Sequence, residues 1–205
     1  MKILAVCTGT AEKLPGKSYK TGINKHAVTG NVMIDANGLI GDAICNRKHH
    51  GGVDQAVYVE GSLTLDWWAR ELGQPVPPGL FGENIVIEGL DNAEVAVGDR
   101  FVAGDLELEV TSARIPCATF AARMGDPKFV KRYTQAGLPG IYCRVLKPAA
   151  VSAGTTVQYL RYEGDRLTMP VLMATYGRNL GMQDRARYLA LPISERLRAM
   201  LEAKA

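Results

Sequence analysis

Residues 99–113, DRFVAGDLELEVTSA, decide the fold class. Apolar and polar residues alternate on both sides of Ala103-Gly104-Asp105, a pattern typical of two half-buried strands joined by a tight turn. The stretch therefore predicts a β-hairpin. Similar short patterns recur along the chain, and they predict strands at 2–7, 26–35, 39–45, 54–60, 83–89, 140–148 and 155–163.

Turn residues separate these strands roughly every 8–12 residues, and we see no regular alternation of strands with helices. Asn37-Gly38, between two of the strands, is a strong short-range hairpin signal. The spacing predicts a mostly β fold, closed like a barrel or folded as a sandwich, with a few added helices.

Helical patterns are few in the first part of the chain and frequent in the last. Residues 62–72 have apolar residues at helical spacing between Ser62, which is expected to cap the helix, and Gly73, which is expected to end it. Residues 126–137 begin at Asp-Pro and end at a glycine. Three short helical segments follow Leu167. We therefore predict a β-rich body at 1–163 and a small helical appendage at 164–205.

Composition narrows the functional classes. Of 205 residues, 47% are hydrophobic and 22% are charged, which is typical of a globular protein. No apolar run approaches the roughly 20 residues of a membrane helix, and the start lacks a secretion signal, so we expect a cytoplasmic protein with no membrane partner. The appendage holds seven of the 24 Lys and Arg residues but four of the 21 Asp and Glu residues. A solvated face explains this excess better than nucleic-acid binding.

The four cysteines form no CxxC pair, which argues against a zinc site or a redox dithiol. Cys7 and Cys143 lie within strand-like runs, where a free cysteine acts as a small buried hydrophobe. Cys45 is ambiguous. Cys117 follows a strand instead of lying within one, so it is a candidate for chemistry.

The sharpest local signal is the sequence Arg114-Ile115-Pro116-Cys117. A nearby guanidinium favours the thiolate, which is the form that binds metals and attacks electrophiles. Pro116 fixes the backbone just before the thiol. A thiol-dependent hydrolase, with His50 as the partner of Cys117, stays open at this point.

Four other residues are candidates for ligand binding. Lys25 lies between glycines at the start of a strand and is suited to a phosphate contact. His50 and Gly51 belong to an HHGG stretch in which the backbone can approach a ligand closely. Asn84 carries both a donor and an acceptor for the edge of a planar ligand. A zinc centre would need all three histidines of the chain, which we disfavour.

Seven motifs occur together in the order found in MOSC domains, and the chain resembles the YiiM-type branch of that family over nearly its full length. The motifs are GINKHAVTG (22–30), GLIGD (38–42), HHGGVDQAVY (49–58), FGEN (81–84), GD (98–99), RIPC (114–117) and RVL (144–146). The helical tail also resembles that branch. Glu60 departs from it, because many relatives have an aromatic residue there, and we expect this change at the rim of the site.

The resemblance implies a β-barrel-like fold that binds molybdopterin-bound molybdenum, the molybdenum cofactor. Cys117 would ligate the metal. Pocket residues would be Lys25, His50, Gly51, Asn84 and Arg114. The implied activity is reduction of N-hydroxylated compounds, such as hydroxylamino nucleobases, to amines.

Such a reduction needs an external electron-donating reductase, because the chain has no flavin, haem or iron–sulfur signature. The helical tail could dock that reductase or shape the mouth of the site. A carrier that holds the cofactor or sulfur on Cys117 is the alternative function. The sequence separates carrier from enzyme poorly, since both use the same cysteine.

Overall fold

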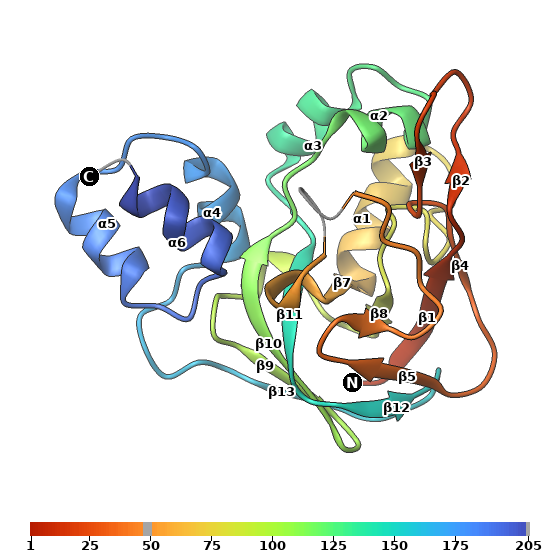
Figure 1. The fold of residues 1–205 in the computed structure, drawn as a ribbon, viewed down its shortest axis with the longest axis horizontal. Coiled ribbons are helices and arrows are strands. Elements are labelled where there is room, and N and C mark those ends of the chain that lie inside the picture. The colour runs from red at the N-terminus through yellow and green to blue at the C-terminus, as the bar shows by residue number, and fades with distance from the viewer. Residues whose placement is uncertain (47–50, 204–205) are drawn as a thin grey trace.

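The body of the protein is built on one eight-stranded sheet (Figure 1). The computed structural model describes residues 1–46 and 51–203, and the strands follow the order β13-β9-β10-β11-β7-β8-β1-β4. The strands are β1 (Ile3–Gly9), β4 (Lys25–Ala27), β7 (Val57–Gly61), β8 (Ile85–Ile87), β9 (Arg100–Ala103), β10 (Leu106–Ala113), β11 (Ile141–Lys147) and β13 (Val157–Leu160).

The hairpin predicted at 99–113 is confirmed. Strands β9 and β10 pair in antiparallel register, and the pair Ala103 with Leu106 closes the turn. Gly104 has a φ of 61°, a left-handed conformation that glycine adopts without a steric cost. Inward-facing residues such as Phe101 and Leu108 are buried, as the alternating pattern requires.

The two ends of the sheet approach each other, which gives the body its barrel-like form. Lys2, just before β1, forms an isolated bridge with Thr156, just before β13. Backbone hydrogen bonds of 2.9 Å run from Ile3 N to Thr155 O and from Val157 N to Met1 O. Strand β4 nevertheless remains an edge, so the predicted barrel-like fold is confirmed without a fully paired barrel.

One pair of strands corrects the prediction that strands and helices do not alternate. Strands β7 and β8 are parallel, with Val59 opposite Ile85, and helix α1 (Ser62–Leu72) lies in the connection between them. A parallel pair needs a long crossover, and residues 62–84 supply one. The prediction failed because this connection holds a proline-rich loop after its helix, which hides the βαβ unit.

Two small sheets complete the β structure. One has the order β12-β5-β6, and the other is a hairpin of β2 and β3. Asp35 pairs with Gly38, so the predicted hairpin turns at Ala36-Asn37, one residue earlier than the signal indicated. The strands are β2 (Glu12–Lys13), β3 (Lys20–Thr21), β5 (Val32–Asp35), β6 (Gly38–Leu39) and β12 (Ala149–Val151).

The helix predicted at 62–72 is confirmed, with one correction at its start. Gly61 is the N-cap, and the Ser62 hydroxyl accepts a hydrogen bond from Gly89 N instead of capping the helix. Two helices follow Cys117 where the sequence predicted one: α2 (Ala118–Met124) and α3 (Phe129–Ala136). Helix α2 was missed because seven residues are too short for a clear period. The 3₁₀ turns are η1 (Val53–Gln55) and η2 (Asn92–Glu94).

An aromatic cluster fixes α1, α2 and α3 together at one end of the body (Figure 1). Trp68 is buried and stacks on Tyr133 with ring centroids 5.5 Å apart, and Phe81 meets Phe120 edge-on at 5.2 Å. Trp68 therefore serves packing. Cys7 and Cys143 are also buried, and burial raises the pKa of both thiols, that of Cys7 to about 12.

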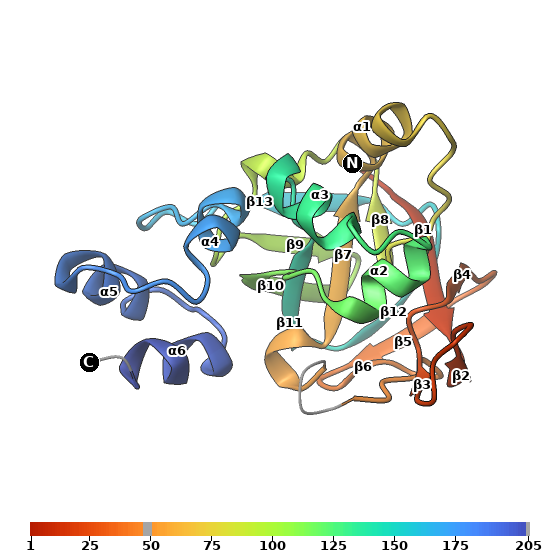
Figure 2. The same cartoon turned by 90° about the horizontal axis from the view of Figure 1, so that it is seen from above.

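The appendage consists of α4 (Met169–Thr175), α5 (Met182–Leu189) and α6 (Glu195–Glu202), which stand beside the body (Figures 1 and 2). Its connection is firmly held, because Asp99 is buried and accepts hydrogen bonds from Tyr162 N at 2.8 Å and from Arg166 Nη1 at 2.9 Å. The predicted boundary at 163/164 falls in this connection. None of the helices in the described ranges has the length and apolar character needed to cross a membrane.

Candidate functional site

One pocket brings together five of the six predicted site residues. Its space outside the protein atoms is about 810 Å³, including the open mouth, a size suited to a small organic ligand. The wall includes Lys25, Gly51, Asn84, Arg114 and Cys117. The sixth residue, His50, lies outside the described residues.

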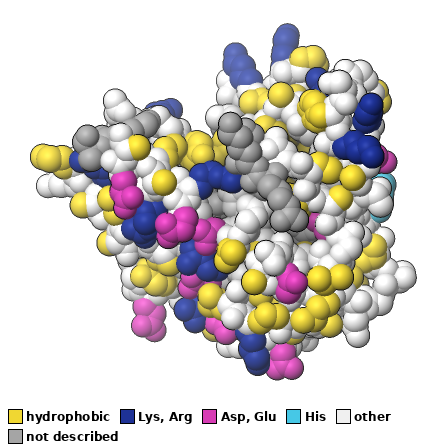
Figure 3. All heavy atoms as spheres, in the orientation of Figure 1, with side chains coloured by type: hydrophobic (Ala, Val, Ile, Leu, Met, Phe, Trp, Pro, Cys, Tyr) yellow, Lys and Arg dark blue, Asp and Glu magenta, His cyan; other side chains and the backbone are white. Residues whose placement is uncertain are grey.

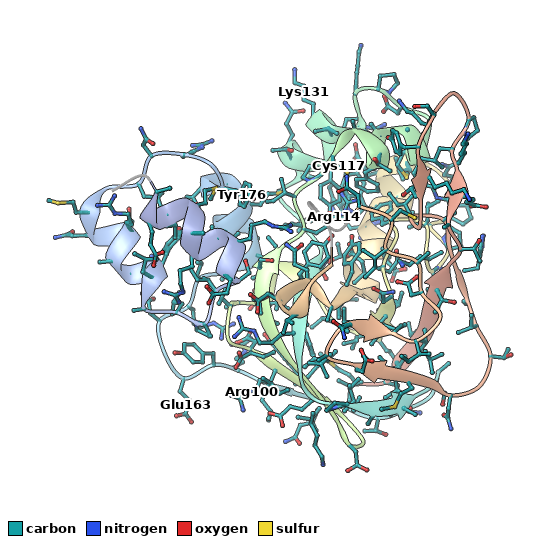
Figure 4. The ribbon with its side chains drawn as sticks, viewed as in Figure 1. Arg100, Arg114, Cys117, Lys131, Glu163 and Tyr176 are labelled. Carbon is teal, nitrogen blue, oxygen red and sulfur yellow. The ribbon has the colours of Figure 1, made fainter. Side chains whose placement is uncertain are left out.

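Cys117 lies where strand β10 has ended and helix α2 begins. The pairing of β10 with β11 ends at Ala113 and Ile141. One further backbone hydrogen bond, from Arg114 N to Gly140 O at 2.8 Å, follows before the chain leaves the sheet. Cys117 is the N-cap of α2 and is half-buried in the pocket wall. The thiol is therefore presented to the pocket from a fixed backbone, and Figure 4 shows Arg114 close beside it.

The guanidinium of Arg114 is buried and rests on aromatic rings. Its central carbon lies 3.6 Å from the ring centroid of Phe120 and 5.7 Å from that of Tyr58. Within the described part of the chain, Arg114 Nη1 has no hydrogen-bond partner. A buried donor without a partner is costly, so this nitrogen is suited to an anionic ligand in the pocket.

The electrostatic surroundings keep Arg114 charged. Burial on its own would lower the pKa of the guanidinium, but the phenol groups of Tyr58, Tyr133 and Tyr142 and the Cys117 thiol raise it. Arg114 and Cys117 therefore interact electrostatically, as the spacing in the sequence suggested. The cation favours the negative form of any group beside it.

Lys25 is also buried, but its ammonium is paired. Its Nζ binds both carboxylate oxygens of Asp42. Asp42 also accepts hydrogen bonds from Gly9 N at 2.8 Å and from Asn84 Nδ2 at 2.9 Å. The phosphate contact predicted for Lys25 stays a prediction, while this geometry gives Lys25 a part in holding the wall.

The amide of Asn84 is fully engaged within the protein. Its Oδ1 accepts from Tyr58 N at 3.1 Å, and its Nδ2 donates to Cys7 O as well as to Asp42. These bonds join β8 to β7 and β1 at the base of the pocket. The predicted contact of Asn84 with a planar ligand also stays a prediction.

Sequence reasoning did not single out several residues of the pocket. Asp42 lines the pocket and closes the GLIGD motif, and an acidic residue within a recognised motif was a usable signal. Tyr58 and Tyr142 are partners across β7 and β11, with ring centroids 5.4 Å apart. The exposed thiol of Cys45 also lines the pocket, which resolves its ambiguity in favour of an accessible position.

Glu60 lies behind the pocket and not on its rim, which corrects our expectation. Its side chain is fully buried because β7 is a central strand. Glu60 Oε1 accepts from Tyr58 Oη at 2.5 Å, and Oε2 accepts from Asn92 Nδ2 at 2.5 Å. Burial raises the pKa of Glu60 to about 8, although both hydrogen bonds lower it.

A second buried acid, Glu83, organises the loop that enters β8. It accepts hydrogen bonds from Gly79 N at 2.5 Å and from Phe81 N at 3.0 Å. Burial raises its pKa, while these backbone donors lower it. Because its oxygens hold loop backbone, Glu83 is part of the support of the pocket and not of its surface.

The appendage reaches the rim of the pocket through α6. Glu195 N donates to Asp54 Oδ2 at 2.7 Å, and Arg196 Nη1 donates to Gln55 Oε1 at 3.0 Å. Gln55 itself lines the pocket, and Asp54 also pairs with Arg144 at 3.0 Å. Figure 3 shows charged side chains of both signs where the appendage meets the body.

The described part of the pocket offers one half-buried thiol, an exposed thiol and an unpaired cationic donor. No group of three or more His, Cys, Asp or Glu side chains in residues 1–46 and 51–203 could hold a metal ion.

Residues 46–158 match the model of the MOSC domain family. YflK of Bacillus subtilis (strain 168) is 33% identical over 145 residues, which are 71% of this chain and 66% of YflK. A protein named "Reductase" from Gibberella moniliformis is 29% identical over 185 residues, 88% of this chain and 33% of that protein. Protein YiiM of Escherichia coli (strain K12) is 29% identical over 164 residues, 78% of this chain and 72% of YiiM.

The chain thus spans just under two thirds of YflK and one third of the Gibberella protein. Its fold is similar to the crystal structure of YiiM from Geobacillus stearothermophilus, with a TM-score of 0.81. That likeness covers 99% of this chain and 98% of the other at 23% identity, so it shows the shared fold, including the appendage.

Proposed function

Because the chain belongs to the MOSC domain family and is of the YiiM type, we propose that it is a molybdenum-cofactor-dependent reductase of N-hydroxylated compounds. The observation that carries this proposal is the joint position of Cys117 and the unpaired Arg114 nitrogen in one pocket. A relative named as a reductase supports the same class of activity.

The residues present fit such a cofactor. A soft thiolate from Cys117 suits molybdenum, and the orphaned Arg114 Nη1 suits a phosphate oxygen. Gly51 has a positive φ of 72° and offers backbone in the wall. Lys25 and Asn84 line the same pocket, and both are hydrogen-bonded to Asp42. When bound, the cofactor would supply the redox chemistry that breaks an N–O bond.

The side chains of the protein would bind and orient the substrate. The rings of Tyr58 and Tyr142 offer an apolar surface on which a planar N-hydroxylated substrate can lie. Burial of Arg114 keeps its charge poorly solvated and therefore effective. Electrons come from an external reductase, which we propose as the protein partner, in the cytoplasm.

Metal analysis tests the ligand. Wild-type protein from a host that makes the cofactor should carry molybdenum, and Cys117→Ala should lose it. Cys45→Ala is the matched control, because Cys45 lines the same pocket and its loss should leave the metal content unchanged. Equal molybdenum in wild type and Cys117→Ala would refute Cys117 as the ligand.

A turnover assay then separates an enzyme from a carrier. Loaded protein should reduce an N-hydroxylated base to its amine with an artificial electron donor. Protein that carries molybdenum but does not turn over would instead support the carrier function. The two thiols of Cys45 and Cys117 in one pocket are the feature that favours this second candidate.

A further inference from the structure

We infer that Glu60 and Tyr58 form an internal acid that delivers a proton to the substrate in the pocket. The inference rests on the reductase function proposed above, because reduction of an N–O bond consumes protons. It concerns a carboxyl group that none of the pocket motifs includes, on the strand behind the pocket wall.

Geometry puts Tyr58 between the pocket and Glu60. Residues two apart on a strand project to the same face, so Tyr58 and Glu60 share one side of β7. Tyr58 lines the pocket, and its hydroxyl is bonded to Glu60 Oε1 at 2.5 Å. The guanidinium carbon of Arg114 lies 5.7 Å from the centroid of the Tyr58 ring.

The surroundings hold this pair in one arrangement. Asn92 binds the second oxygen of Glu60 and is itself fixed by Gly61 N at 2.8 Å and by Pro139 O at 3.1 Å. Gly140 leaves room for the pair, because a Cβ there would lie 2.5 Å from Glu60 Oε1 and 2.6 Å from Tyr58 Oη. Three segments of the chain therefore fix the position of the Glu60 carboxyl: strand β7, the turn at Asn92 and the segment Pro139-Gly140.

The charge state agrees with an acid. With a pKa raised by burial to about 8, Glu60 is protonated at neutral pH. Asn92 Nδ2 is a donor, so Oε2 must accept. The Tyr58 hydroxyl donates to Oε1 when the carboxyl is ionised, and in the neutral carboxyl the bond reverses, so that Oε1–H donates to Tyr58 Oη. The titratable or charged groups that act on Glu60 or are acted on by it are Tyr58, Glu83, Arg114 and Tyr133.

The proposed step balances as follows. The N–O bond of R–NH–OH breaks, two electrons come from the external reductase, and two protons are taken up to give R–NH₂ and H₂O. The Tyr58 hydroxyl gives one proton to the departing oxygen while Glu60 passes its proton to Tyr58. The second proton comes from water at the pocket mouth, and Glu60 is later reprotonated from water by the reverse route.

The first test needs no cofactor. In ¹³C NMR of cofactor-free protein, the carboxyl carbon of Glu60 should titrate near pH 8. In Tyr58→Phe it should titrate higher, because the hydrogen bond that lowers this pKa is gone. Titration of wild-type Glu60 near the ordinary glutamate value of about 4.3 would overturn the inference.

The second test uses the loaded enzyme. Wild-type kcat should fall as the pH rises above about 8, and Glu60→Gln should lower kcat about 100-fold and abolish this fall, with molybdenum content unchanged. Glu109→Gln is the control: Glu109 is a buried carboxylate of β10 that pairs with Arg100 and Arg144 outside the pocket. It should keep the wild-type pH profile.

The outcomes separate the two proposals. Loaded wild type that fails to reduce any N-hydroxylated compound overturns the reductase function and the acid with it. Active wild type beside a Glu60→Gln variant with the same kcat and pH profile overturns only the acid. If Glu60→Gln does not fold, Tyr58→Phe must show the loss of kcat for the inference to stand.

Discussion

Lys25 and Arg114 are both buried cations in the wall of one pocket, yet the protein treats them differently. Lys25 is bound by both oxygens of Asp42, whereas no carboxylate of the described residues forms an ion pair with Arg114. Arg114 instead rests on Phe120 and Tyr58, and its Nη1 has no hydrogen-bond partner among the described residues. The paired cation stabilises the pocket wall, and Arg114 is the cation that we propose to bind an anionic ligand.

The largest effect on stability is expected when the buried ion pair of Lys25 and Asp42 is broken. Asp42→Asn leaves the ammonium of Lys25 buried without a counter-charge, which should lower the free energy of unfolding by about 3–5 kcal/mol. Urea unfolding of cofactor-free protein measures this change. Asn at 42 keeps the size of the side chain, so packing contributes little.

The control for this prediction is an exposed pair. Lys147 and Asp105 lie at the surface, and Asp105→Asn should change stability by at most about 1 kcal/mol. Adding Lys25→Met to Asp42→Asn should recover much of the lost stability, because the uncompensated charge is then gone. A similar loss in the single and the double variant would contradict the account of Lys25.

The next effect concerns the cation kept for a ligand. Arg114→Met should weaken binding of inorganic phosphate to the cofactor-free protein by about 10–100-fold, since a hydrogen bond to a charged group contributes about 1.5–3 kcal/mol. Isothermal calorimetry measures this affinity. The methionine preserves part of the contact with Phe120, so the fold should survive.

Lys20→Gln is the matched control for Arg114, because Lys20 is an exposed cation at the same pocket. Loss of the Lys20 charge should reduce phosphate affinity much less than loss of Arg114. The affinity difference between wild type and Lys20→Gln should shrink further in salt, because salt screens exposed charges. If the two variants bind phosphate equally well, the distinction between paired and ligand-directed cations fails.

Sequence patterns predicted the local parts of this structure well. The β9–β10 hairpin and helix α1 depend on alternation and caps within a few residues, and both were found at nearly the expected positions. The parallel pair of β7 and β8 was not predicted, because pairing across a long connection leaves no local signal. Helix α2 was not predicted, because seven residues are too short for a clear helical period.

The same limit applies to the site. Motifs identified the region of Cys117 and Arg114, but which cation is paired depends on Asp42, which lies 17 residues from Lys25 along the chain. Glu60 was expected on the rim because the sequence does not show that β7 is central, between β11 and β8. Burial of its carboxyl follows from strand order, which emerges only in the fold.

Glu60 extends the comparison from cations to acids, because it is a buried carboxyl that forms no ion pair with any cation in residues 1–46 and 51–203. Its pKa is raised from 4.5 to about 8, so its neutral form is favoured by folding. Its stabilising contribution is complete below about pH 4.5 and is lost as the pH rises to about 8. Stability should fall over this window by up to about 1.4 kcal/mol per pH unit.

Urea unfolding of cofactor-free protein between pH 5 and pH 9 checks this slope. Glu60→Gln should flatten it, leaving the part that Glu83 contributes, whose pKa burial also raises. Glu109→Gln should leave the slope largely unchanged. An equal slope in wild type and Glu60→Gln would contradict the raised pKa.

The smallest effect is expected at the rim, where a partly exposed pair holds the appendage to the pocket. Asp54→Asn weakens the bonds to Arg144 and to Glu195 N, and it should cost about 1 kcal/mol, because solvent screens both partners. Hydrogen exchange is the measurement: amides at the start of α6 should exchange faster, while those of β10 should not.

Arg161→Gln is the control, because Arg161 forms an exposed pair with Glu94 away from the rim, and it should change neither set of amides. Equal exchange rates of the α6 amides in wild type and Asp54→Asn would contradict this prediction. They would show that the hydrogen bond from Arg196 to Gln55 holds α6 at the rim of the pocket on its own.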